Sequence, residues 1–484
     1  MTVPPSQMPW VGGPSAAQFH AYDEFPSHRN FRGGGRSRGR GRGFSHRYFR
    51  GRVRSHSRNA KSTSKIEVKP SENKDKGAFC YSKIRSLRKV DFEIHGSIRR
   101  TSYIGVGEND DVQTFYYFIE SENNPRGDPL VLWLTGGPGC SSLSGLIYEI
   151  GPIAFQIDGY NGGLPTLVYR PYSWTKASSI VFVDIPVNAG FSYATTEFAS
   201  HRSDWFSWLM DHPEFLTNKL YIAGDSYSGK LVPVIADEIS KGNEQGLQPW
   251  INLQGYLMGN PKVDQNSANY RIPFAHGMGL ISDELYQMTS DIFIEHILEP
   301  ACEDYSSHKP LESCRRRSVA ENYPWKFNDT RPRLQLRKCP YDKYLLSDYW
   351  ANDDKVRNAL NVRKGTKEIW KRCTKDLPYK EDIPSSIPYQ LNLSKKGYRS
   401  LIYSGDHDML IPYLSTQASI RSLNYSIVDD WRPWYTDGQV AGYTRTYSSA
   451  MTFATVKGAG HIAPEYKPQE CFHMYTSWIS HMPF

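Results

Sequence analysis

Two serines in the middle of the chain stand where a nucleophile could. Ser226 and Ser228 lie in LYIAGDSYSGKLVP (220–233), between a short apolar run and apolar residues at helical spacing. A strand, a tight glycine-containing turn and a helix form a nucleophile elbow, which lifts one serine hydroxyl out of the sheet. Ser226 is the central serine of the usual G-x-S-x-G pattern, in which Ser228 replaces the last glycine. The pattern predicts Ser226 as a nucleophile; the alternative is a polar turn between two apolar runs.

Carboxylates and a histidine follow further along the chain. Asp406 and Asp408 come directly after the apolar run RSLIYSG, and His461 follows a glycine-rich turn after MTFATV. A serine hydroxyl becomes a good nucleophile when an imidazole takes its proton, and a carboxylate fixes the tautomer of that imidazole. The order serine, acid, histidine is that of α/β-hydrolases. The spacing therefore predicts a triad of Ser226 and His461 with one of the two aspartates.

A second glycine cluster, TGGPGCSS (135–142), ends another apolar run. Three glycines in four positions let the backbone approach a ligand closely and aim its N–H groups outward. An oxyanion hole needs such a loop, with the amide after the nucleophile as the second donor. A phosphate-binding loop is the alternative, but the sequence has no G-K-[ST] there. The loop therefore favours acyl chemistry.

Six apolar runs are expected to form the buried strands that position these residues. They alternate with helical stretches, and their carboxyl ends carry the glycines and polar residues. This alternation predicts an α/β fold with a mainly parallel, doubly wound sheet, whose active site lies beyond the carboxyl ends of the strands. The charged section from about 262 to 345 breaks the alternation and predicts an inserted cap region. The six predicted strands are 129–135, 178–187, 219–224, 252–260, 399–406 and 452–461.

Residues 1–78 differ in composition from the rest of the chain. Residues 29–58 contain eleven arginines and no acid; without them the net charge of +8 becomes −3. Arg-Gly repeats with few aliphatic side chains cannot build a core, so we expect a disordered tail. Its arginines and interspersed Phe44, Tyr48 and Phe49 could bind RNA through phosphate charge and base stacking. The alternative is a solvated extension without a partner.

The compartment signals in the sequence conflict. The beginning of the chain lacks the basic start and apolar core of a secretory signal, and no apolar run is long enough to cross a bilayer. The sequons at Asn328, Asn392 and Asn424 suit a glycosylating, oxidising compartment. The seven cysteines show neither C-x-x-C pairs nor a spacing to histidines that suits zinc. We therefore expect no metal and no cofactor, and both a secretory and a cytoplasmic or nuclear location remain open.

From about Tyr103 to Phe484 the chain resembles the serine carboxypeptidase family, in its plant carboxypeptidase-like form. The matching stretches include FYYFIESENNP, LVLWLTGGPGCSSLSGL, YIAGDSYSG, NLQGYLMGNP, YSGDHDM and MTFATVKGAGH. The resemblance implies that 79–484 is an α/β-hydrolase domain with a cap. It makes Ser226 the nucleophile and His461 the base, and the family's spacing from the glycine that ends the strand selects Asp408 as the acid.

The resemblance implies further pairings and roles. The N–H groups of Gly137 and Tyr227 would form the oxyanion hole. By the family's pattern Cys140 pairs with Cys373 and Cys302 with Cys339, which leaves Cys80, Cys314 and Cys471 over. Vacuolar or secreted location is the family's usual one. Two stretches, 202–215 and 282–302, are shorter than in the family, and a mispredicted or alternatively spliced gene product would explain this.

Two substitutions in the pattern bear on the substrate. Peptidases of the family have Asn before the double glycine and Glu before the nucleophile, which together hold the terminal carboxylate of a peptide; here these residues are Thr135, before Gly136, and Asp225. The combination resembles the branch that transfers acyl groups from 1-O-glucose esters of aromatic acids to an alcohol or amine. We therefore expect an acyltransferase. The alternatives are a carboxypeptidase that releases C-terminal residues and, in another class, an inactive hydrolase domain with an RNA-associating tail.

Overall fold

The computed structural model describes residues 99–106, 110–196, 206–288, 303–304, 309–310, 343–375, 377, 379 and 381–484. Several expectations fall outside these residues: the tail 1–78, much of the cap, and the sites Cys80, Cys302, Cys314, Cys339 and Asn328.

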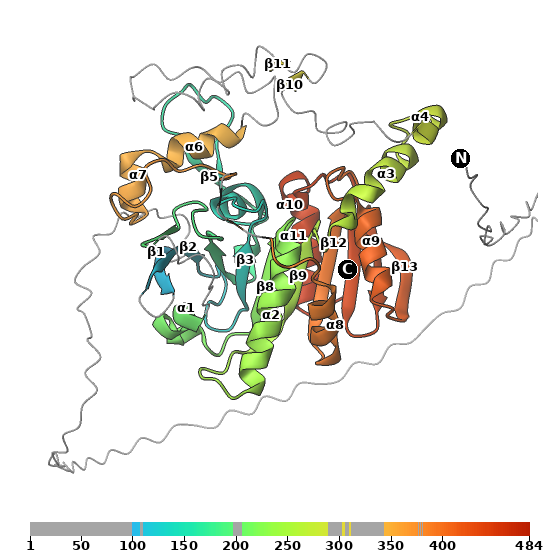
Figure 1. Ribbon diagram of the computed structural model, residues 1–484, viewed down its shortest axis with the longest axis horizontal. Helices are drawn as coiled ribbons and strands as arrows, with labels where there is room; N and C mark the ends of the chain where they lie inside the picture. The colour runs from blue at the N-terminus through green and yellow to red at the C-terminus, as the bar shows by residue number, and fades with distance from the viewer. Residues whose placement is uncertain are drawn as a thin grey trace, which may run out of the picture. The chain divides into compact units, whose positions relative to one another are not determined.

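An eleven-stranded sheet lies at the centre of the described residues (Figure 1). Six neighbouring strands run parallel, in the order β6-β3-β8-β9-β12-β15. Nearly all of their residues are buried, because helices cover both faces of the sheet. All six match predicted strands, which confirms the α/β fold. Their bounds are β3 Leu130–Leu134, β6 Ser179–Val183, β8 Leu220–Asp225, β9 Leu253–Gly259, β12 Arg399–Gly405 and β15 Met451–Val456.

Antiparallel strands extend the sheet at both edges, and the sequence pattern did not predict them. One edge consists of β1 (Arg99–Val106) and β2 (Val112–Ile119), with the short β7 (Tyr193–Ala194) paired to β2. The other edge is the hairpin of β13 (Ile427–Thr436) and β14 (Gln439–Tyr447). Strand β13 is mostly exposed and mixes polar with apolar residues, so it lacks the continuous apolar run of a buried strand. Two small sheets pair β4 (Ile153–Phe155) with β5 (Leu167–Tyr169) and β10 (Glu303–Asp304) with β11 (Lys309–Pro310).

Side chains of each central strand alternate between two cores. On β3, Val131 and Trp133 join one core, whereas Leu132 and Leu134 join the other. In the first core the rings of Trp174 and Tyr475 stack with centroids 3.9 Å apart. The elements on this side are η1 (Gly145–Glu149), η2 (Trp174–Lys176), α6 (Leu345–Ala351), α7 (Asp354–Ala359), α10 (Ala463–Tyr466) and α11 (Pro468–Ile479).

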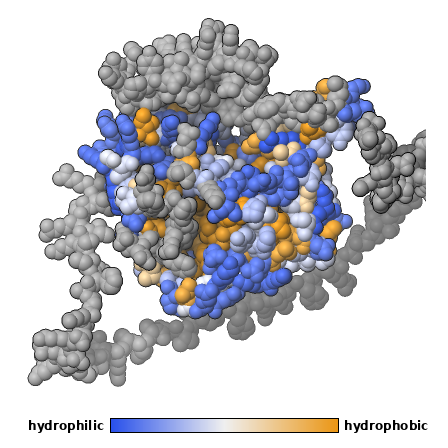
Figure 2. All heavy atoms as spheres, in the orientation of Figure 1, coloured by the Kyte–Doolittle hydropathy of each residue, from blue (hydrophilic) through white to orange (hydrophobic). Residues whose placement is uncertain are grey.

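The second core lies under the long helix α2 (Ser228–Glu244), which buries Val232, Ala236 and Ile239 against the sheet. The other elements on this side are α1 (Phe206–Asp211), η3 (Pro213–Phe215), α8 (Ile387–Lys395) and α9 (Tyr413–Ser422). After β9 come η4 (Asn266–Tyr270), α3 (Arg271–Gly277) and α4 (Asp283–Met288), which are the first part of the expected cap region. Figure 2 shows hydrophilic side chains along α2 and an apolar area beside them.

The described sequons differ in their surroundings. Asn424 is exposed after α9, whereas Asn392 lies within α8 and its amide donates a hydrogen bond to the buried carboxylate of Asp237. None of the described helices has both the length and the apolar character that a membrane crossing requires.

Candidate active site

Ser226 stands at the turn between β8 and α2. Its φ of +55° lies in the left-handed region, which non-glycine residues seldom adopt. Two backbone hydrogen bonds hold this strained turn: the Ser226 N–H donates to Gly259 at 2.9 Å, and the Lys262 N–H donates to the Ser226 carbonyl at 2.8 Å. Ser228, in contrast, is buried, and its hydroxyl donates to the Leu134 carbonyl at 2.8 Å. Of the two serines, Ser226 therefore has its side chain available for chemistry.

The structure joins Ser226, His461 and Asp408 in one hydrogen-bonded chain. The Ser226 Oγ lies 2.8 Å from the His461 Nε2, and the His461 Nδ1 lies 2.8 Å from the Asp408 Oδ2. The three residues come from the ends of three different strands: β8, β15 and β12. An imidazole in this position can take the serine proton while the carboxylate orients the ring.

Asp408, not Asp406, is the aspartate that reaches the imidazole. Its Oδ1 accepts hydrogen bonds from the Leu410 N–H at 2.8 Å and the Ile411 N–H at 3.1 Å, so the carboxylate is held from both sides. Asp406 accepts a hydrogen bond from the Gly458 N–H at 2.6 Å and ties two loops together. The two side chains thus have different tasks, although they lie two residues apart.

Asn260 is a partner of Asp408 that the sequence did not reveal. Its amide nitrogen donates to the Asp408 Oδ2 at 2.7 Å, the same oxygen that faces His461. Its φ is +42°, and its N–H donates to the Tyr403 carbonyl at 2.7 Å. The sequence offered one hint of this role: Asn260 is a polar residue directly after an apolar strand. Asn260 adds a third contact that fixes the orientation of the carboxylate.

The glycine loop after β3 fits directly against the elbow. A β-carbon on Gly136 would lie 2.6 Å from the Ser226 Cβ and 2.9 Å from the Tyr227 nitrogen, so only glycine allows this approach. Among the described residues, neither the Gly137 N–H nor the Tyr227 N–H donates a backbone hydrogen bond in a turn, loop or cap. Both are therefore available to an oxygen atom that develops negative charge.

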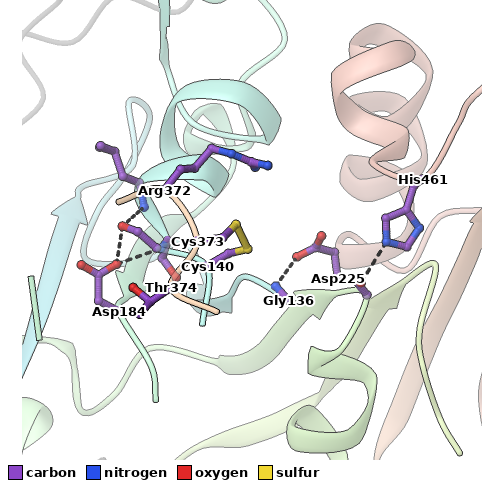
Figure 3. Close-up of a disulfide and its surroundings, with 12 residues drawn as sticks. Gly136, Cys140, Asp184, Asp225, Arg372, Cys373, Thr374 and His461 are labelled. Atoms are coloured by element: carbon purple, nitrogen blue, oxygen red, sulfur yellow. Dashed lines mark hydrogen bonds between the residues drawn. A yellow bond between two sulfur atoms is a disulfide. The ribbon is translucent and has the colours of Figure 1, made fainter. Parts of the chain in front are cut away.

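A disulfide and a buried aspartate hold the glycine loop (Figure 3). Cys140 is bonded to Cys373, as expected from the resemblance. Asp184, directly after β6, accepts hydrogen bonds from the Ser141 hydroxyl at 2.7 Å and the Ser142 N–H at 2.8 Å. Burial raises the pKa of Asp184 to about 6, against the effect of these hydrogen bonds. Asp184 lies within the predicted strand 178–187, and no feature of the sequence distinguished it from its neighbours.

The expected substrate-binding residues lie in two different environments. The Gly136 N–H donates to the buried Asp225 carboxylate at 3.2 Å, and Figure 3 shows the two between the disulfide and His461. The Thr135 hydroxyl instead accepts a hydrogen bond from the Trp133 indole at 3.2 Å. Thr135 therefore has its oxygen engaged within the protein, while Asp225 faces the loop.

Two buried carboxyl groups near the elbow have raised pKa values. Burial raises the pKa of Asp225 to about 6, although His461 and the Gly136 N–H lower it. Glu149 in η1 is fully buried; burial and then the charge of Asp225 raise its pKa well above the ordinary value. One of its oxygens has no hydrogen-bond partner among the described residues. Burial of Glu149, which the sequence gave no reason to select, therefore favours the neutral form of its carboxyl group.

Residues 94–481 match the family described as serine carboxypeptidase. The chain belongs to the serine carboxypeptidase family. Serine carboxypeptidase-like 7 of Arabidopsis thaliana is 51% identical over 398 residues, which is 79% of this chain and 90% of that protein. Serine carboxypeptidase-like 19 of the same plant is 47% identical over 428 residues, 79% of this chain and 91% of that protein.

A solved carboxypeptidase structure has the same fold. A prohormone-processing carboxypeptidase from Saccharomyces cerevisiae superposes with a TM-score of 0.60 at 21% identity, covering 79% of this chain and 91% of that one. At this identity the similarity concerns the fold alone. Within the described part of the serine carboxypeptidase domain, no group of three or more His, Cys, Asp or Glu side chains is arranged to hold a metal ion.

Proposed function

We propose that this member of the serine carboxypeptidase family is an acyltransferase that uses 1-O-glucose esters of aromatic acids as donors and an alcohol or amine as acceptor. The proposal assigns the catalytic roles to Ser226, His461 and Asp408, with the oxyanion hole at Gly137 and Tyr227. The hydrogen bonds of 2.8 Å on both sides of His461 support the first three roles.

The reaction proceeds in two halves through an acyl-enzyme. The Ser226 Oγ attacks the ester carbonyl while the His461 Nε2 takes its proton, and the negative oxygen accepts hydrogen bonds from the N–H groups of Gly137 and Tyr227. The C–O bond to glucose then breaks, and His461 gives the proton to the departing sugar oxygen. In the second half His461 takes a proton from the acceptor, whose oxygen or nitrogen attacks the acyl carbon. The bond from that carbon to the Ser226 Oγ then breaks, and His461 gives the proton to the Oγ.

The environment of Asp225 is the reason for proposing acyl transfer and not peptide cleavage. A peptide substrate brings a terminal carboxylate, which must be neutralised by hydrogen-bond donors when it leaves water. Here Asp225 stands where the peptidases have the longer Glu, and Thr135, in place of Asn, engages its hydroxyl oxygen with Trp133. Asp225 is one methylene shorter than Glu and its carboxylate already accepts the Gly136 N–H, so the grip on a peptide carboxylate is altered, whereas a glucose ester brings hydroxyl groups and no charge.

The test compares kcat/KM for a blocked dipeptide and for an aromatic 1-O-glucose ester on one preparation, with an alcohol or amine acceptor present. We expect measurable acyl transfer and little or no release of C-terminal residues. The double variant Thr135→Asn/Asp225→Glu should shift the ratio toward the dipeptide. A wild-type protein that cleaves dipeptides better than it transfers acyl groups would restore the carboxypeptidase alternative.

Labelling with a fluorophosphonate separates both enzymes from the non-enzymatic alternative. A working triad reacts covalently at Ser226, whereas an inactive domain with an RNA-associating tail does not. The disulfide between Cys140 and Cys373 supports an oxidising compartment, so we propose a vacuolar or secreted location. Mass spectrometry of the natural protein would test this through the linked cysteine peptides, and free thiols there would point to the cytoplasm or nucleus.

A further inference from the structure

Lys230 is a buried cation that the catalytic steps do not use. It lies four residues after Ser226, in the first turn of α2, and its side chain is 0% exposed. Burying an ammonium group is costly, and the N-terminal end of a helix carries partial positive charge, which makes this position worse. A lysine at this position therefore needs an anionic or hydrogen-bonding partner, and the identity of that partner indicates the structural role of Lys230.

Both partners of Lys230 come from the chain that follows the disulfide. Its Nζ forms an ion pair with Glu381 and donates to the Ile383 carbonyl at 3.0 Å. The Ser386 hydroxyl adds a hydrogen bond to the Gly229 carbonyl at 2.7 Å. We call this region the strap; its described residues are 372–375, 377, 379 and 381–386. Its far end is thus fixed to the first turn of α2.

The near end of the strap is fixed to the glycine loop. Besides the disulfide at Cys373, the Ser141 N–H donates to the Arg372 carbonyl at 2.8 Å, and the Thr374 N–H donates to the Gly139 carbonyl at 2.9 Å. The strap therefore connects the loop expected to bind the oxyanion with the helix that follows the nucleophile.

Between these two ends the strap places Tyr379 against Tyr227. The Tyr227 hydroxyl donates to the Tyr379 hydroxyl at 3.0 Å, and the two rings meet edge to face with centroids 5.9 Å apart. Tyr227 directly follows Ser226, so this pair is built on the residue next to the nucleophile. Lys262 lies beside it, with its Nζ 5.4 Å from the centre of the Tyr227 ring.

The half-buried Tyr379 presents two features to a ligand. Its ring offers an edge and a face to another aromatic group, an arrangement that stabilises aromatic pairs. Its hydroxyl accepts the proton of Tyr227, and among the described residues its own proton goes to no acceptor, so it can donate to a ligand oxygen. Together these features suit an aromatic ring that carries an oxygen substituent.

We propose that Tyr379 contacts the aromatic acyl group on Ser226 and determines acyl specificity, and that the Lys230–Glu381 ion pair positions Tyr379 for this contact. The inference rests on the proposed function, because it requires an acyl group on Ser226. It deepens that function by naming the part of the protein that selects the acyl group.

The test uses two fluorophosphonates that differ in one substituent on phosphorus, an ethyl group or a hydroxyphenyl group. The measurement is the ratio of their second-order rate constants for reaction at Ser226. We expect the ratio of aromatic to ethyl reagent to fall about tenfold in Tyr379→Ala and in Glu381→Gln, and less in Tyr379→Phe, which loses only the hydroxyl. A ratio removes effects on the triad that both reagents share.

Glu244→Gln is the matched control. Glu244 pairs with Lys396 at 2.9 Å at the other end of α2, so this variant also removes an ion pair of the helix but leaves the strap alone. Its ratio should equal that of the wild type. Thermal unfolding of each variant checks folding, and Tyr379→Phe keeps the test informative if the alanine variant does not fold.

The outcomes separate the two proposals. If the wild type reacts with neither reagent, the proposed function fails and the role of Tyr379 fails with it. If it reacts with both and neither Tyr379→Ala nor Tyr379→Phe lowers the ratio, the specificity role alone is wrong. If the Tyr379 variants lower the ratio but Glu381→Gln does not, Tyr379 selects the acyl group without help from the ion pair, and the second half of the proposal is wrong.

Discussion

The two ends of the parallel strands satisfy buried polar groups in different ways. At the carboxyl ends lie the buried carboxylates Asp184, Asp225 and Asp408. At the amino ends, neutral side-chain amides donate hydrogen bonds to loop carbonyls. Asn218, before β8, donates to the carbonyls of Pro125 at 2.8 Å and Asp128 at 2.7 Å. Asn252, before β9, donates to the Thr217 carbonyl at 3.1 Å.

This difference shows where the fold tolerates charge. A neutral amide satisfies a loop at little cost, whereas a buried carboxylate shifts its pKa upward unless hydrogen bonds offset the burial. Asp184 and Asp225 carry such shifts, and two residues with positive φ, Ser226 and Asn260, lie at the same end. Three buried carboxylates therefore gather at the carboxyl ends of the parallel strands, which is where reactive groups are expected.

The largest expected effect concerns the two serines. Ser226→Ala should lower kcat by roughly five to six orders of magnitude, because it removes the nucleophile. Ser228→Ala loses one buried hydrogen bond to Leu134 and should cost about 1 kcal/mol of stability with most of the activity kept. Steady-state kinetics and thermal unfolding of both variants provide the check. An inactive Ser228 variant beside an active Ser226 variant would contradict the assignment of the elbow.

The second effect separates the two aspartates. Asp408→Asn should lower kcat by about four orders of magnitude, because an amide cannot hold the imidazole in the required tautomer. Asp406→Asn keeps an oxygen for the Gly458 N–H and should leave kcat close to that of the wild type. Equal losses in the two variants would show that the contact between Asp408 and His461 is not the one that matters.

The third effect is the pH dependence of substrate choice. Since the pKa of Asp225 is raised to about 6, its carboxyl group is neutral below this pH and ionised above it. A neutral carboxyl can donate to a peptide carboxylate, whereas an ionised one repels it. The ratio of kcat/KM for a dipeptide to that for a glucose ester should therefore rise roughly tenfold from about pH 7 to about pH 5.

Asp225→Asn serves as the control for this pH effect. An amide does not titrate, so the ratio should lose its dependence on pH in this variant. The protonation of His461 affects both substrates alike and cancels in the ratio. A slope that persists in Asp225→Asn would assign the effect to another group, and Glu149 would be the next residue to test.

The smallest kinetic effect is expected at the amino ends of the strands. Asn218→Ala leaves two carbonyls without their donor and should cost about 1–3 kcal/mol in the free energy of unfolding. Its kcat/KM should match that of the wild type, because no catalytic residue touches Asn218. Chemical denaturation and ester kinetics on one preparation measure both quantities. A large kinetic loss here would show that the two ends of the sheet are not independent.

The central sheet could be predicted because its signal is local. Each of the six parallel strands is mainly apolar and mostly buried, and turn residues follow it closely. The edge strands could not be predicted in the same way. Strand β13 has one largely exposed side and alternates irregularly, so its pairing with β14 depends on the hairpin and not on burial.

For the site, sequence alone determined the kinds of groups and their order along the chain: a serine in an elbow, a glycine loop and a histidine after the last strand. These follow from residue type and short-range spacing, which a linear pattern records. The resemblance already selected Asp408 over Asp406, and only the tertiary structure decided that Asn260 supports Asp408 and that Tyr379 reaches Tyr227. Each of these depends on the direction of a side chain at a turn, and packing between segments far apart in sequence sets that direction.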